Sequence, residues 1–196
     1  MPGTFDHTHW EKFLKQNNPD SFSYIYKKYV DDLYAYGVSL GFDSDMCKDS
    51  IQDVFYKLYS KRTELSHIEN LRFYLFRSLR NRLFDLHRQQ NKLEPIEWSL
   101  NQFPIEVTVL KQIEDEEDNA FLKQKVESLL QLLTSRQREA VYLRYMQNLE
   151  YDEIGKMLKM NSESVRKLVY RALEAIRKNT PDTSLSLLTL ISLLYS

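Results

Sequence analysis

The chain has 196 residues, which is enough for one ordinary domain or two small ones. Hydrophobic residues make up 42% and charged residues 28%, a globular mixture that excludes wholesale disorder. With only 4 glycines and 5 prolines, long helices are expected, and the one cysteine, Cys47, excludes an internal disulfide and favours the reducing cytoplasm.

The net charge of −1 conceals an alternation along the chain. Residues 72–92 contain six basic residues and one acidic residue, and residues 159–178 contain six basic and two acidic ones. Between them, residues 94–118 contain eight acidic residues and one basic residue. This pattern predicts two surfaces that bind a polyanion and a spacer that repels it.

Residues 1–92 predict one small helical domain. The N-terminus lacks the basic start and apolar run of a secretory signal, and the His7-x-His9 pair there is typical of a solvated tail rather than a metal site. The first helix is expected to begin at Asn18-Pro19 and to end near Gly41, because these are cap and stop signals.

Two further helices complete this domain. The second is expected from Asp43 or Ser44, and the third spans residues 71–88 after a polar loop at residues 61–70. The apolar stripe of the second helix is Ile51, Val54, Phe55, Leu58 and Tyr59. That of the third is Leu71, Leu75, Leu79, Leu83 and Leu86. Three amphipathic helices with short connections can close one core.

The third helix also has a face on which rings and cations alternate. Its members are Phe73, Arg77, Arg80, Phe84 and Arg88. Arginines bind phosphates and rings stack on exposed bases, so this face suits single-stranded or distorted nucleic acid. The alternative is a charged surface whose two rings pack toward the core.

Residues 93–118 are predicted to be an acidic linker, because they contain Pro95 and Pro104 and no sustained period; one extended stretch is expected at 105–109. Residues 119–180 predict a second helical domain, in which Thr134 and Gln137 form a capping box for a helix over 135–146. The tail, residues 181–196, has an apolar run about half as long as the roughly 20 residues that cross a bilayer. A docked helix is favoured over stable membrane insertion.

Residues 150–178 predict a helix-turn-helix, with Gly155 as the small residue at the crossing of the two helices and Met160 in the turn. The predicted inner face of the second helix is Val165, Leu168, Ala172 and Ile176. Its outer face presents long donors that can contact phosphates and base edges: Ser164, Arg166, Lys167, Tyr170 and Arg171. An ordinary amphipathic helix pair with a solvated face is the alternative.

Several motifs together resemble sigma factors of bacterial RNA polymerase. The run from Asp49 to Phe55 resembles the D-x-x-Q-x-x-F signature of their second conserved region, and the run from Asn81 to Arg88 resembles the end of that region. Residues 133–139 and the helix-turn-helix are similar to the fourth region. The order and spacing resemble the extracytoplasmic-function group, which keeps only these two regions. Where Gly155 and Lys159 stand, that family usually has alanine and glycine.

The resemblance implies an all-α protein of two small domains that gives promoter specificity to polymerase and has no catalysis or cofactor of its own. Its implied partners are core RNA polymerase, through the β′ clamp and the β flap, promoter DNA and an anti-sigma factor. The implied core-polymerase contacts are Asp49, Gln52, Asp53 and Phe55. The implied minus-10 contacts are Ser66, Asn70, Arg77, Arg80, Asn81 and Arg88. The implied minus-35 contacts are Ser164, Arg166, Lys167, Tyr170 and Arg171.

Two other classes of protein remain as alternatives. A stand-alone helix-turn-helix regulator would explain residues 150–178 but not the Asp49 to Phe55 motif. An enzyme finds little support, because the sequence lacks a glycine-rich phosphate loop, a cysteine pair and an H-E-x-x-H motif. No metal site is expected.

Overall fold

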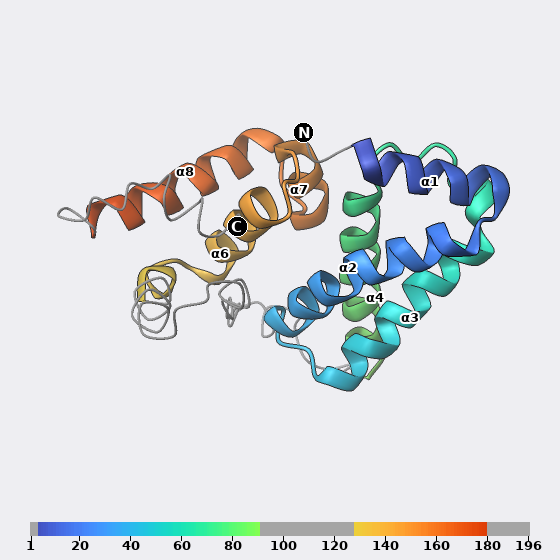
Figure 1. The fold of residues 1–196 in the computed structure, drawn as a ribbon. Coiled ribbons are helices and arrows are strands. Elements are labelled where there is room, and N and C mark those ends of the chain that lie inside the picture. Colours follow the sequence, from blue (N-terminus) through green and yellow to red (C-terminus); the bar gives the residue numbers. More distant parts are fainter. Residues whose placement is uncertain (1–3, 91–127, 180–196) are drawn as a thin grey trace, which may run out of the picture. The chain divides into compact units, whose positions relative to one another are not determined.

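The computed structural model describes residues 4–90 and 128–179, and all of the regular elements in these ranges are helical (Figure 1). The chain divides into two compact units, and the boundary between them falls within residues 91–127. The predicted acidic linker, the extended stretch at 105–109 and the apolar tail lie outside the described residues. No helix in the described ranges is long and apolar enough to cross a membrane.

In the first unit, residues 4–90 form four α-helices and one 3₁₀ turn. They are α1 (Thr4–Gln16), α2 (Pro19–Ser39), α3 (Ser44–Ser60), the turn η1 (Arg62–Leu65) and α4 (Leu71–Gln90). The side chain of Asn18 caps α2 by accepting from the Ser21 amide at 2.8 Å, and Asp43 caps α3 in the same way. The predicted starts of both helices are therefore correct, and Gly41, at φ 89°, ends the first of them in the left-handed region.

Helix α1 is absent from the sequence-based prediction, which treated the N-terminus as a solvated tail. It packs on α2 and η1, with Trp10 and Phe13 buried. His9 stacks on Tyr24 with ring centroids 4.1 Å apart, and its Nδ1 lies 3.3 Å from the Ser21 hydroxyl. The prediction of three helices is thus short by one, and His9 takes part in helix packing.

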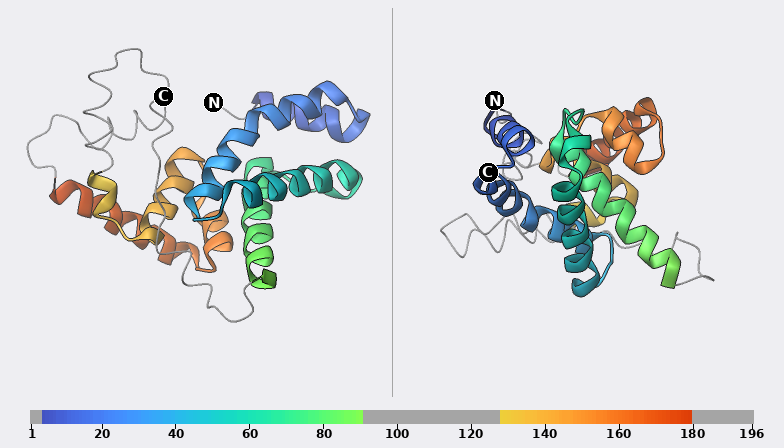
Figure 2. Two further views of the ribbon diagram at one scale, coloured as in Figure 1. Left: turned by 90° about the horizontal axis from the view of Figure 1, so that it is seen from below. Right: turned by 90° about the vertical axis from the view of Figure 1, so that its right-hand side faces the viewer.

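Helix α4 crosses α2 and α3 and buries one side against both (Figures 1 and 2). Four of the five predicted leucines are buried, while Leu86 is half-buried; Phe76 and Phe84 complete the buried side. Helices α2 and α3 approach closely at Gly37, where an added Cβ would lie 2.7 Å from the Cys47 sulfur. A larger residue at this position would force the two helices apart.

The second unit is built on α6 (Ser135–Val141), the π-helical turn η4 (Tyr142–Met146), α7 (Tyr151–Leu158) and α8 (Ser162–Lys178). The capping box at Thr134 and Gln137 is present, as predicted. The expected single helix over 135–146 changes at Tyr142 into a wider turn, in which the Gln147 amide donates to the Tyr142 carbonyl at 3.1 Å. The core lies between α6, α7 and α8.

Candidate nucleic-acid interface

The turn between α7 and α8 has the geometry of a helix-turn-helix. Lys159 ends α7 in the left-handed conformation, at φ 54° and ψ 47°, and the Met160 amide donates to the Gly155 carbonyl at 2.9 Å. An added Cβ at Gly155 would lie 2.6 Å from the Met160 carbonyl oxygen. Glycine at this crossing therefore lets the turn close tightly, and Asn161 caps α8 through the Ser164 amide at 2.7 Å.

The inner face of α8 differs by one residue from the prediction. Val169 is buried and Leu168 is only half-buried, while Val165, Ala172 and Ile176 are buried as expected. The buried face therefore follows the 165, 169, 172, 176 spacing, because α8 packs on α6 as well as on α7. The outer face still contains the basic residues.

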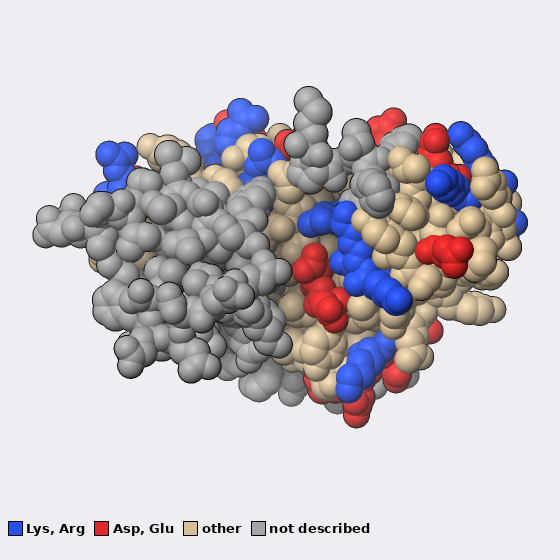
Figure 3. All heavy atoms as spheres, viewed as in Figure 1, with Lys and Arg blue, Asp and Glu red and all other residues tan. Residues whose placement is uncertain are grey.

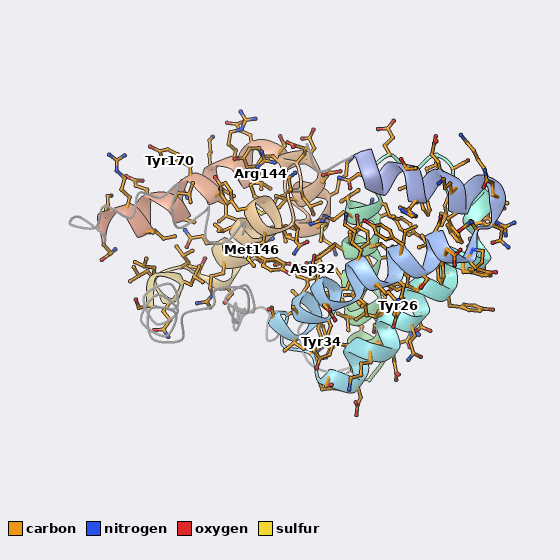
Figure 4. The ribbon with its side chains drawn as sticks, in the orientation of Figure 1. Tyr26, Asp32, Tyr34, Arg144, Met146 and Tyr170 are labelled. Carbon is orange, nitrogen blue, oxygen red and sulfur yellow. The ribbon has the colours of Figure 1, made fainter. Side chains whose placement is uncertain are left out.

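Four of the five predicted minus-35 residues are exposed along α8, namely Arg166, Lys167, Tyr170 and Arg171. Tyr170 is 67% exposed, and Figure 4 shows its ring pointing away from the body of the unit. Ser164 is half-buried at the first turn, and Lys167 forms an ion pair with Glu163 at 2.7 Å. The exposed donors lie on the side of α8 opposite the buried residues, as recognition through a major groove requires.

Tyr151, the first residue of α7, contacts arginines of both α8 and the π-helical turn η4. The sequence-based prediction did not identify this residue. The guanidinium of Arg166 lies 5.3 Å from the centre of its ring, and that of Arg144 lies 4.9 Å from it. Arg144, labelled in Figure 4, also donates to the Leu149 carbonyl at 2.8 Å and forms an ion pair with Glu150 at 3.1 Å. Burial lowers the pKa of Arg144, but the hydrogen bond to Glu150, the charge of Glu150 and the interactions with Tyr151 together outweigh burial, so the pKa is raised. The pattern Arg-x₆-Tyr offered no recognisable signal in the sequence.

In the first unit, three predicted polymerase contacts are exposed along α3. Asp49, Gln52 and Asp53 border an open groove that α4 completes with Arg82 and Leu86. Both Nε and Nη2 of Arg82 donate to one carboxylate oxygen of Asp53, at 2.8 and 2.7 Å. The groove thus presents carboxylates next to a cation supplied by the same chain.

Phe55 is only 3% exposed, so its ring lies in the core and not on the surface with the other three predicted polymerase contacts. The ring packs edge-on against Tyr26, at a centroid distance of 4.8 Å, and against Phe22 at 6.2 Å. It belongs to the core between α2 and α3. The neighbouring Tyr56, by contrast, is 75% exposed on the same side of α3 as Asp49 and Asp53.

On α4, Arg77, Asn81 and Arg88 are exposed and Arg80 is half-buried. The ring of Phe84 is only 6% exposed and is covered by the guanidinium of Arg80 at 4.6 Å. The alternative predicted that both rings pack toward the core. It holds for Phe84, on which a base cannot stack in this conformation, whereas Phe73 is only half-buried. Arg88 forms an ion pair with Asp85 and donates from Nε to the Phe84 carbonyl at 3.3 Å. Helix α4 thus presents mainly guanidinium and amide donors.

The loop between α3 and α4 contains the other two predicted minus-10 residues. Ser66 is exposed, whereas the carboxamide oxygen of Asn70 accepts from the Phe73 amide at 3.1 Å and so caps α4. The loop is not irregular throughout, because η1 occupies its first half.

Acidic and basic side chains alternate over small areas of the described surface in Figure 3.

Burial raises the pKa of Asp32, although Arg72 opposes the shift, and burial raises the pKa of the Cys47 thiol to about 11. No group of three or more metal-ligating side chains is found among residues 4–90 and 128–179.

Comparisons with known proteins match both units. Residues 25–93 match the family model for sigma-70 region 2, and residues 123–176 match that for sigma-70 region 4. The ECF RNA polymerase sigma factor SigM of Bacillus subtilis (strain 168) is 22% identical over 153 residues, which are 78% of this chain and 91% of that protein.

Two solved structures share the fold. One is CnrH in complex with the cytosolic domain of CnrY, with a TM-score of 0.55, 17% identity and coverage of 92% of this chain and 100% of that one. The other is the sigma factor RpoE in complex with the anti-sigma factor NepR from Bartonella quintana, with a TM-score of 0.56, 19% identity and coverage of 82% and 97%. Since the two family matches occur in order and together cover more than half of its residues, the chain belongs to the sigma-70 family and is a sigma factor of the extracytoplasmic-function group.

Proposed function

We propose that this sigma factor directs core RNA polymerase to promoters through a duplex contact made by α8 and a second contact made by α4 and the loop before it. The observation that carries the proposal is the exposed face of α8, where Arg166, Lys167 and Arg171 stand beside a helix-turn-helix turn. Long donors on a helix of this kind recognise base edges and phosphates in the major groove. The minus-35 element is the proposed target.

The first unit is proposed to engage the minus-10 element while its strands separate. Exposed Arg77, Asn81 and Arg88, with half-buried Arg80, supply phosphate and base donors along α4, and Ser66 presents a hydroxyl from the adjoining loop. Because Phe84 is buried, we assign no stacking role to it. The contacts to opened strands would be made by hydrogen bonds and charge.

Docking on polymerase is proposed to use the groove between α3 and α4. Asp49, Gln52 and Asp53 form its α3 side, and the β′ clamp is the proposed partner, with the second unit meeting the β flap. Phe55 is excluded from this set because its ring is in the core. The protein then has no catalytic step of its own and works in the cytoplasm, where polymerase is found.

A protein inhibitor is a further proposed partner. The sigma factor of Bartonella quintana with the same fold is bound to an anti-sigma factor in its solved structure. An anti-sigma factor that covers the DNA-binding or polymerase-binding surfaces of this chain would keep it inactive.

Transcription reconstituted from purified core polymerase, this chain and genomic fragments tests the proposal. We expect defined transcript starts that depend on the chain, and loss of those starts when Arg166 and Arg171 are both replaced by alanine. If the chain binds a promoter tightly without polymerase and adds no starts to the core enzyme, it is a stand-alone regulator and the proposal fails.

A further inference from the structure

The loop between α3 and α4 is held by backbone hydrogen bonds at both ends. The Glu64 amide donates to the Lys61 carbonyl at 2.9 Å, and the Ile68 amide donates to the Leu65 carbonyl at 3.0 Å. At the far end Asn70 caps α4. These bonds close local turns within the loop, and one of them spans Ser66; a further contact to the loop backbone comes from another element.

That element is α1. Trp10 is 4% exposed, and its indole Nε1 donates to the Ile68 carbonyl at 3.3 Å. A buried indole N–H without an acceptor is destabilising, so this bond favours one position of the loop backbone. Ile68 lies two residues from Ser66 on one side and two residues from Asn70 on the other, so Trp10 holds the loop between both proposed minus-10 residues.

Helix α1 is itself firmly placed. Phe13 is completely buried and lies 5.2 Å from the ring of Phe22 on α2 and 5.9 Å from that of Tyr59 on α3. The Trp10 ring follows at 5.9 Å from Phe13. The indole is therefore a rigid donor, anchored on two helices of the unit and aimed at the loop.

We propose that Trp10 is a positioning residue for minus-10 recognition, which acts by fixing the loop backbone at Ile68 so that Ser66 is presented in one geometry. Helix α1 lies outside residues 25–93, which match sigma-70 region 2, so the family match does not assign this role. The inference rests on the proposed function of the loop, and it adds the N-terminal helix to the promoter-recognition machinery.

The test compares Trp10→Phe, which keeps a ring but removes the indole N–H, with Phe13→Leu, which loosens packing without touching the bond. Full-length variants are assembled with core polymerase at a temperature where both are folded. Open complexes are measured on a matched promoter and on one with a single change in the minus-10 element, with the minus-35 element constant. The discrimination ratio is the amount of open complex on the matched promoter divided by that on the changed one. We expect Trp10→Phe to lower this ratio about 2- to 10-fold, the effect of one hydrogen bond, and Phe13→Leu to leave it unchanged.

Hydrogen exchange at residues 66–70 separates loop placement from DNA recognition. Trp10→Phe should speed exchange there more than Phe13→Leu does. Unchanged exchange, or an equal loss of discrimination in Phe13→Leu, would overturn the positioning role. Faster exchange together with a wild-type ratio of open complexes on the two promoters would also overturn the positioning role. In that case Ser66→Ala tests whether the loop contributes to promoter recognition at all. If Ser66→Ala lowers the ratio, the loop still recognises the promoter; if it does not, the proposed function of the loop fails as well.

Discussion

Tyr151 illustrates how one side chain can set the direction of another. Two guanidinium groups lie within 5.3 Å of the centre of its ring, and one of these belongs to Arg166, a proposed base contact. A cation over a ring near the surface is stabilised by about 0.5–1 kcal/mol. This energy is enough to favour one orientation of an arginine that would otherwise sample many.

We therefore expect Tyr151→Leu to reduce discrimination at the base pair that Arg166 contacts by about 2- to 5-fold, because the guanidinium loses its favoured orientation. Tyr151→Phe keeps the ring and should behave as wild type. Holoenzyme binding to a set of minus-35 variants measures both. If the Phe variant loses as much as the Leu variant, the hydroxyl and not the ring is responsible.

At the residue level, the sequence predicted types of residue better than their orientation. Gln52 and Phe55 occur in the same motif, yet one is exposed and the other is in the core. The helical period places them only about 60° apart around α3, so the period alone does not separate them, and the packing of α2 decides which of the two side chains is covered. The same reason moved the buried position on α8 from Leu168 to Val169.

The elements were predictable where local signals mark them. Asn18, Asp43 and the capping box at Thr134 all announce helix starts that the structure contains. Helix α1 has no such signal, and among residues 8–16, whose burial is described, Trp10 and Phe13 are its buried side chains. Its stability comes from tertiary packing on α2 and η1, which local sequence does not report.

On α3, Gln52→Ala should weaken binding to core polymerase about 2- to 10-fold and leave the fold unchanged, because the side chain is exposed. Phe55→Ala should instead lower the free energy of unfolding by about 3–5 kcal/mol. Gln16→Ala, at an exposed position on α1, is the matched control. Fluorescence titration of core polymerase and thermal unfolding report the two effects. Wild-type affinity for Gln52→Ala would refute the docking role of this position.

Helices α4 and α8 should differ in the kind of DNA that they engage. Replacing Arg80, Asn81 and Arg88 should impair promoter opening, and a template with a pre-melted bubble should partly restore it, because the bubble removes the cost of unpairing. The bubble should not restore upstream sequence preference to variants of Arg166 or Arg171. Permanganate reactivity of unpaired thymines on both templates measures the difference. Equal rescue of both classes would contradict the division of work.

For the whole molecule, the net charge of −1 opposes binding to DNA even though α4 and α8 are locally basic. We expect the isolated protein to bind duplex DNA no more tightly than about 10⁻⁶ M at physiological salt, with little sequence preference. Specificity should emerge in the complex with core polymerase. Gel shifts at fixed salt with the free chain and with holoenzyme provide the measurement, and tight specific binding by the free chain would count against it.

The contact between Gly37 and Cys47 has a practical consequence for following the stability of the first unit. Cys47 is the one cysteine of the chain and is fully buried, and burial raises its pKa to about 11, which lowers the fraction of thiolate at neutral pH. Alkylating reagents attack the thiolate, so the native protein should be labelled slowly and the unfolded chain rapidly. The rate of labelling, measured by mass spectrometry across a urea series, then reports the unfolding of the first unit. Unfolding confined to the second unit should leave this rate unchanged. Fast labelling in native buffer would show that α2 and α3 separate readily.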